Sequence, residues 1–91
     1  MAHCPFQKLS DLKKILDEIR RWDGIIETRP GVFYLKRKPF LHFHEKDGKR
    51  WADAKVGDAW GAQIHIPFGA TALQLKKFLS VVRKRYKDSI L

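Results

Sequence analysis

Three of the four histidines in this 91-residue chain lie in stretches that read as β-strands. His42 and His44 alternate along one strand, so their imidazoles point to the same face, and His65 lies on a later strand. Three converging imidazoles could bind zinc, which takes three or four nitrogen, sulfur or oxygen ligands. The His-x-His spacing is also ordinary on a half-exposed strand, where neutral imidazole fits. Because the pattern is unspecific, we predict no metal site and no cofactor.

Catalysis by proton transfer would need a histidine or carboxylate with a shifted pKa in a cleft. His42, His44, Asp53 and Asp58 are residues of the required type. The chain has no nucleophile elbow, P-loop, dinucleotide-binding glycine run or paired-cysteine knuckle. We therefore predict no catalytic residue, and the sequence leaves enzyme activity undecided.

Positive charge is concentrated near the end of the chain, where residues 71–91 hold six Lys/Arg and one acid. At 100° per residue, five of these cations fall on one arc of a helix opposite its apolar side. They are Lys76, Lys77, Arg83, Lys84 and Lys87. Cations at helical spacing can contact successive phosphates without reading a base sequence. We predict non-specific binding of DNA or RNA through this helix, with Arg37 and Lys38 as secondary contacts; a merely solubilising face is the alternative.

A second functional surface is predicted on the sheet face that the helices leave uncovered. His42, His44, His65 and Trp51 are its candidate residues. An aromatic ring beside basic residues can stack on nucleic-acid bases, although a small core also needs large rings. The alternative function is therefore a module that binds a small ligand, a protein partner or a second copy of the chain through this face.

The elements that position these residues follow from periodicity and turn chemistry. Apolar residues at helical spacing predict a first helix from Ser10, as N-cap, to Trp22, and Thr71 begins a capping box for the second. Between them the pattern predicts strands at 25–28, 32–36, 40–45, 50–56 and 59–66. The fold class is α+β: a two-layer sandwich of an antiparallel sheet of about four strands, with the N- and C-terminal helices on one face.

Length and composition set the remaining bounds. The chain carries a net charge of +9 and predicts one domain over residues 1–91, with residues 1–8 as a flexible N-terminal segment. No apolar run approaches the length of a membrane span, and MAHCPFQKLS lacks a signal-peptide core. The single cysteine, Cys4, cannot form an internal disulfide. These features favour a cytoplasmic protein without a membrane partner.

The segment from Phe33 to Val56, FYLKRKPFLHFHEKDGKRWADAKV, resembles the MmcQ/YjbR family of small bacterial α+β proteins. In that family a strand, a short basic turn, a strand ending in a Leu-His-Glu-type motif and an Asp-Gly turn follow one another. The resemblance implies a CyaY-like arrangement and a DNA-binding role of unproven kind. The resemblance covers about a quarter of the chain. Compared with the family, this chain is shorter after the third strand and lacks the early proline-rich segment. It assigns no catalytic residue.

Overall fold

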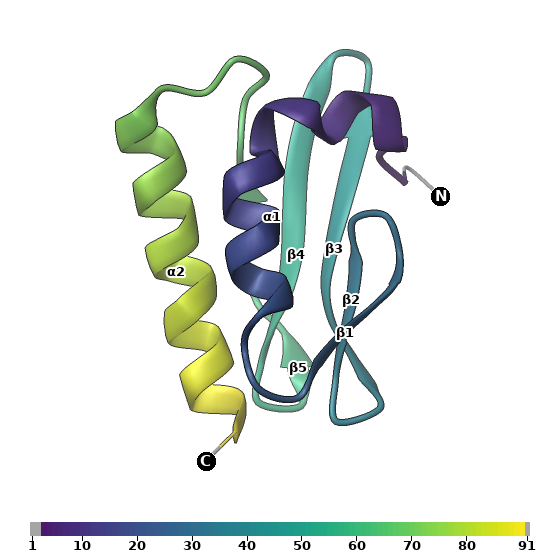
Figure 1. The fold of residues 1–91 in the computed structure, drawn as a ribbon, viewed down its shortest axis with the longest axis vertical. Coiled ribbons are helices and arrows are strands. Elements are labelled where there is room, and N and C mark those ends of the chain that lie inside the picture. Colours follow the sequence, from purple (N-terminus) through teal and green to yellow (C-terminus); the bar gives the residue numbers. More distant parts are fainter. Residues whose placement is uncertain (1–2, 91) are drawn as a thin grey trace.

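The structure of the protein is a computed structural model, which describes residues 3–90. Along the chain, one α-helix precedes the strands and one follows them, as predicted, and a 3-10 helix, η1, precedes the first α-helix (Figure 1). The elements are η1 (Phe6–Leu12), α1 (Lys13–Arg20), β1 (Ile25–Arg29), β2 (Val32–Leu35), β3 (Lys38–Lys46), β4 (Lys49–Val56), β5 (Ala59–Trp60), β6 (Ile64–His65) and α2 (Ala72–Ile90). The predicted α+β class is confirmed.

The sheet is antiparallel, with the order β1-β2-β3-β4-β5, and β6 pairs with β4 beside β5. It therefore has six strands instead of about four. The predicted strand over 59–66 is divided because Trp60 pairs with Lys55 whereas Ile64 pairs with Ala52. Three residues separate Trp60 from Ile64, but only two separate their partners Ala52 and Lys55 in β4. The extra residue interrupts the ladder of hydrogen bonds.

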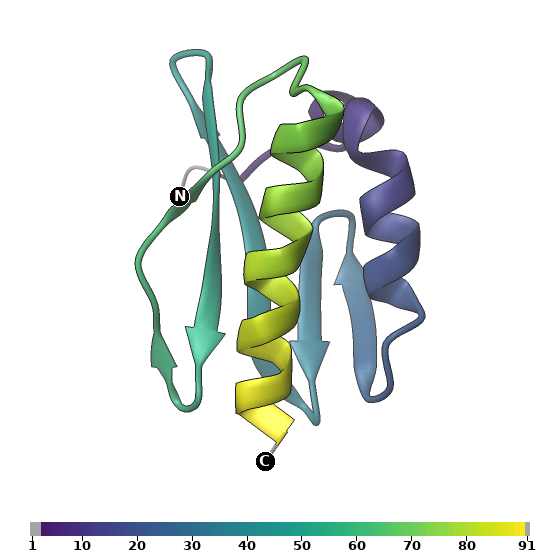
Figure 2. The ribbon, with the colours of Figure 1, turned by 90° about the vertical axis from the view of Figure 1, so that its left-hand side faces the viewer.

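Both helices pack on one face of the sheet, and the apolar residues between the layers form the core (Figure 2). Phe43 of β3 meets Phe78 of α2 with ring centroids 5.6 Å apart. A bulge at Phe40 turns this ring to the same side, where it contacts Tyr86 edge to face at 6.3 Å. The opposite face of β3 and β4 is left without a covering helix.

Turn chemistry explains the tight hairpins. Asp47 and Gly48 have φ values of 53° and 78°, as the predicted Asp-Gly turn between β3 and β4 requires. Lys36 and Arg37 also adopt positive φ, 51° and 70°, in the two-residue turn between β2 and β3. Because non-glycine residues rarely adopt this conformation, the basic turn is held by strand pairing on both sides.

The N-terminal region differs from the sequence-based expectation. Residues 1 and 2 lie outside the described part, but Cys4 of the segment predicted to be flexible is fully buried and its N–H donates to the Phe43 carbonyl. Ser10 does not cap a helix, because the chain enters through η1 and Leu12 holds the N-cap position of α1 without a side-chain hydrogen bond. The capping box at Thr71 is confirmed by reciprocal bonds with Gln74.

One charged side chain, Arg50, lies in the interior with no exposed surface. Its guanidinium donates twice to Asp11, at 2.7 and 2.8 Å, and once each to three backbone carbonyls. These carbonyls belong to Lys8, Ile66 and Pro67. All five N–H groups of the guanidinium are thereby satisfied, and the bonds tie η1 and the loop after β6 to β4.

Candidate nucleic-acid interface and open sheet face

The predicted cationic residues of α2 lie on its solvent-facing side, and all five are exposed. Asp88 is the helix's acidic residue, and it pairs with Lys84 at 3.5 Å. The other four cations make no ion pair with another residue in the described chain: Lys76, Lys77, Arg83 and Lys87. We call these five residues the cationic face. Most of its charge is not neutralised from within the molecule.

The first helix shows the opposite arrangement. Asp17 pairs with both Lys13 and Arg20, and Arg21 pairs with Glu18 at 3.5 Å. Three of the four cations at residues 13–21 are thus paired with acids, and only Lys14 makes no ion pair within the described residues. A stronger positive potential is therefore expected over α2 than over α1.

The cationic face borders α1 on one side and the β6 edge of the sheet on the other. Towards α1, the guanidinium carbon of Arg83 lies 5.9 Å from the Trp22 ring centroid. Towards the sheet edge, Lys77 lines a hollow of about 270 Å³ together with Ile64 and His65 of β6. A ligand on α2 could thus also touch the edge of the sheet.

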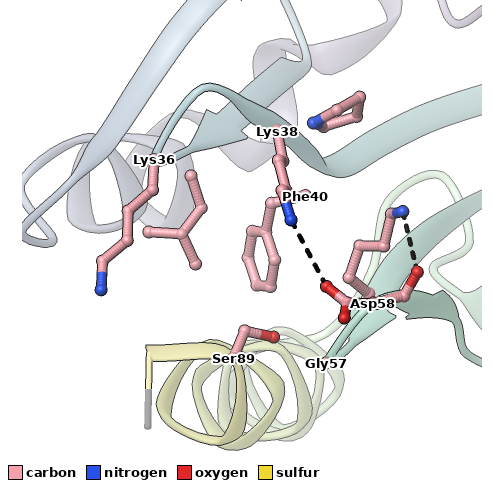
Figure 3. Close-up of a pocket in the computed structure, with 9 residues that line it drawn as sticks. Lys36, Lys38, Phe40, Gly57, Asp58 and Ser89 are labelled. Atoms are coloured by element: carbon pink, nitrogen blue, oxygen red, sulfur yellow. Dashed lines mark hydrogen bonds and ion pairs between the residues drawn. The ribbon is translucent and has the colours of Figure 1, made fainter.

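The basic turn between β2 and β3 lies at the same end of the molecule as the last turn of α2. A hollow of about 190 Å³ is lined by Lys36 from this turn, Lys38 at the start of β3 and Ser89 from α2 (Figure 3). Lys38 pairs there with Asp58 at 3.6 Å but remains exposed, whereas Arg37 is exposed and makes no ion pair with another described residue. Of the two secondary contacts predicted, Arg37 keeps its charge free for a ligand.

The residues predicted for the open sheet face share that face and contact one another. His44 stacks on Trp51, with ring centroids 5.5 Å apart and planes at 22°, and its Nε2 lies 3.1 Å from a carboxylate oxygen of Asp53. His42 lies 6.0 Å from His44, and His65 is the register partner of Trp51. The His-x-His strand thus gives a continuous surface of rings, half-buried at its centre and exposed at His65.

Sequence reasoning missed Trp60 as a member of this surface. Trp60 is 46% exposed; its ring centroid lies 5.3 Å from that of His42 and 4.8 Å from the Lys55 ammonium. No local pattern could have shown this, because it depends on the pairing of β5 with β4.

His42 carries an unpartnered polar atom. Its Nε2 is buried and has no hydrogen-bond partner in the described structure. Burial, followed by the nearby His44, lowers the pKa of His42, whereas Asp53 acts in the opposite direction. The ring is therefore neutral near pH 7, and its orphaned nitrogen is available to a ligand that reaches it.

The histidines do not form a metal centre in the described residues. Over residues 3–90, no three His, Cys, Asp or Glu side chains are grouped so that they could hold a metal ion. The thiol of Cys4 is buried, and burial raises its pKa, so it is a poor nucleophile.

A search with protein-family models, with curated proteins and with solved structures found no match to this chain. The resemblance of residues 33–56 to the MmcQ/YjbR family stays a prediction. No helix in the described residues 3–90 is both long enough and apolar enough to cross a membrane.

Proposed function

We propose that this protein binds nucleic acid without sequence specificity, with the cationic face of α2 as its main phosphate-contacting surface. The observation that carries the proposal is the contrast between the helices: three of the four cations at residues 13–21 are in ion pairs, whereas four of the five exposed cations of α2 have no ion pair within the described residues. Exposed cations without internal partners are free to replace the counterions of a polyanion.

The dimensions of the face fit several phosphates. From Lys76 to Lys87 the helix rises about 16 Å, and one strand of a duplex advances about 3.4 Å per phosphate. Four contacts would give a slope of about −3.6 for log affinity against log salt, a loss of roughly 100-fold between 50 and 200 mM. A weak, strongly salt-dependent and sequence-independent complex is the expected behaviour.

Fluorescence anisotropy with labelled single-stranded and duplex DNA and RNA tests the proposal over a range of salt concentrations. Charge reversal at Lys76 and Arg83 should weaken binding and flatten the salt slope. Reversal at Lys46 and Lys49, exposed residues at the tip of the β3–β4 hairpin, makes the same change in net charge and is the matched control. An equal loss in both variants would show that only net charge matters, and no binding at low salt would end the proposal.

A second candidate function uses the open sheet face to bind a small ligand, a protein partner or a second copy of the chain. It is favoured by the buried, unpartnered Nε2 of His42 beside the half-exposed ring of Trp60. A ligand or partner ring on Trp60 could bring a donor to that nitrogen. Sedimentation velocity and imidazole NMR shifts with a fragment set are the tests; a monomer at all concentrations and unchanged His42 signals would remove this candidate.

A further inference from the structure

We infer that the hollow between α1 and the β1–β2 turn is a binding site for a small carboxylate with a compact apolar body. Its volume is about 320 Å³, at the lower end of the about 300–1,000 Å³ typical of small-molecule pockets. Leu9 and Leu16 from the helices and Pro30 from the turn give it apolar walls, and Phe6 lies at the pocket with 66% of its surface exposed. An apolar pocket beside a few polar groups is the usual form of a ligand site.

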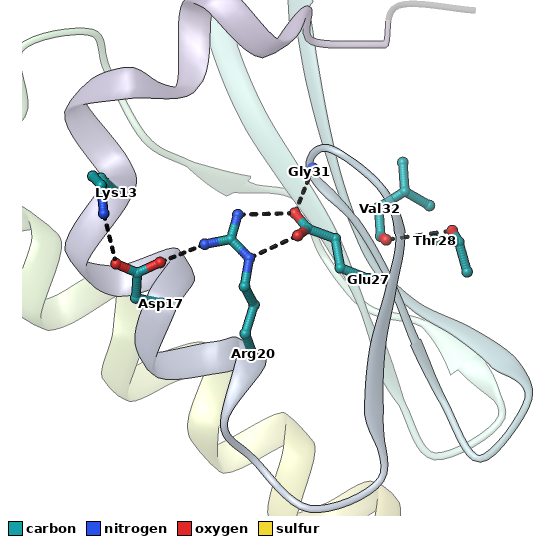
Figure 4. Close-up of polar contacts among 7 residues, drawn as sticks. All are labelled: Lys13, Asp17, Arg20, Glu27, Thr28, Gly31 and Val32. Carbon is teal, nitrogen blue, oxygen red and sulfur yellow. Dashed lines mark hydrogen bonds and ion pairs between the residues drawn. The ribbon is translucent and has the colours of Figure 1, made fainter.

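One side of the pocket is a fixed chain of ionic contacts (Figure 4). Lys13 donates to Asp17 at 3.1 Å, and Asp17 accepts from Arg20. The Arg20 guanidinium also donates from Nε and Nη2 to the two oxygens of Glu27, at 2.6 and 3.2 Å. Glu27 accepts in addition from the N–H of Gly31, at 3.2 Å. Held at three of its N–H groups, the guanidinium is ordered before any ligand arrives.

The donors of this chain are not all used. A guanidinium has five N–H groups, and three serve Asp17 and Glu27, so two remain on Nη1 and Nη2. Lys13 keeps two more, since it makes one hydrogen bond. Both oxygens of each carboxylate already accept a hydrogen bond. The carboxylates are already engaged by these cations, and the unused N–H groups of Arg20 and Lys13 can donate charge-assisted hydrogen bonds, for which a ligand carboxylate is a suitable acceptor.

Two further features of the site have no role in the fold. Ser10 occupies a position where the sequence predicts an N-cap, but its side chain caps no helix, and the residue lines the pocket. Phe6 is a large apolar side chain left in solvent, which an apolar ligand body would cover. The net charge of +9 attracts a small anion from a distance.

NMR titration of the labelled protein tests the site with phenylacetate and its neutral counterpart phenylacetamide, within a panel of aromatic and branched carboxylates. At least one carboxylate should shift the amide signals of residues 6–31 and the Nε signal of Arg20 at about 10 mM or below. Its amide should bind about tenfold more weakly or worse, because a charge-assisted pair is lost. Absence of such shifts with every carboxylate, equal binding of the amide, or binding of phenethylamine instead would overturn the inference.

Matched variants separate this site from other surfaces. Ser10→Trp should fill the pocket and abolish the shifts, whereas Lys14→Trp, at an exposed residue outside the pocket lining, should retain them. Lys13→Met should weaken carboxylate binding, whereas Lys14→Met should not. Binding that survives Ser10→Trp would place the ligand elsewhere. None of these residues belongs to the cationic face of α2, so loss of nucleic-acid binding and loss of carboxylate binding are separate outcomes.

Discussion

Replacement of Asp11 by Asn removes the charge that faces buried Arg50 while keeping the size of the side chain. The pair is bidentate, with N–O distances of 2.7 and 2.8 Å, and Arg50 has no exposed surface. After the change the guanidinium keeps its three carbonyl partners and one amide oxygen, but no negative charge balances it. The Asp11→Asn variant should therefore be markedly less stable than the wild type.

The expected magnitude follows from burial. Breaking a fully buried ion pair costs about 3–5 kcal/mol. The Asp11 side chain is 34% exposed, so water can replace part of the lost interaction. We expect a loss of about 2–3 kcal/mol, a large part of the roughly 5–15 kcal/mol that stabilises a small domain.

Urea unfolding followed by tryptophan fluorescence measures this loss. With a slope near 1 kcal/mol per molar, the low end for small proteins, the midpoint should fall by about 2–3 M. Asp23→Asn is the control, because Asp23 is exposed and its carboxylate makes no ion pair with another described residue. A shift in Asp11→Asn no larger than in this control would refute the reasoning.

The same pair has a defined pH dependence. The hydrogen bonds from Arg50 hold the pKa of Asp11 below its ordinary value of 3.8. The folded protein therefore binds this proton less readily than the unfolded chain, so the contribution is present above the unfolded pKa and is lost as pH falls through the folded pKa. The stabilities of wild type and Asp11→Asn should converge in acid.

Two more predictions use other parts of the fold. Burial lowers the pKa of His42, so the stability of the wild type should fall as the pH drops below about 6.5. His42→Gln should reduce this fall, whereas His65→Gln, at an exposed site, should not. Equal pH profiles for all three proteins would contradict the prediction. Gly31→Ala and Gly48→Ala should each lose roughly 1–2 kcal/mol because φ is 77° and 78°. Gly31→Ala should lose about 1–3 kcal/mol more than Gly48→Ala, because its Cβ would come within 2.8 Å of Leu9, whereas nothing lies within 4 Å of a Cβ at Gly48. Thermal unfolding of the two variants measures the difference, and equal losses would argue against the close contact.

Several elements could be predicted because their signals are local. The Thr71 capping box involves residues three apart, and the Asp47-Gly48 turn depends on two neighbouring residues. The common face of His42 and His44 follows from alternation along one strand. Ser10 shows the limit of such signals: it has the chemistry of a cap, but tertiary packing starts the helical path earlier, at η1.

The sequence by itself determined the order of helices and strands, the apolar faces of the regular elements, and the excess of cations on the last helix. Backbone periodicity acts over two to four residues, which is the range over which a pattern can be read. The tertiary structure decided the contacts that depend on which distant segments meet. Arg50 and Asp11 are 39 residues apart, Arg20 and Glu27 are joined across a helix and a strand, and Trp60 reaches His42 through the register of three strands. Such contacts depend on strand register and helix docking, because a shift of one residue would turn each strand side chain to the opposite face.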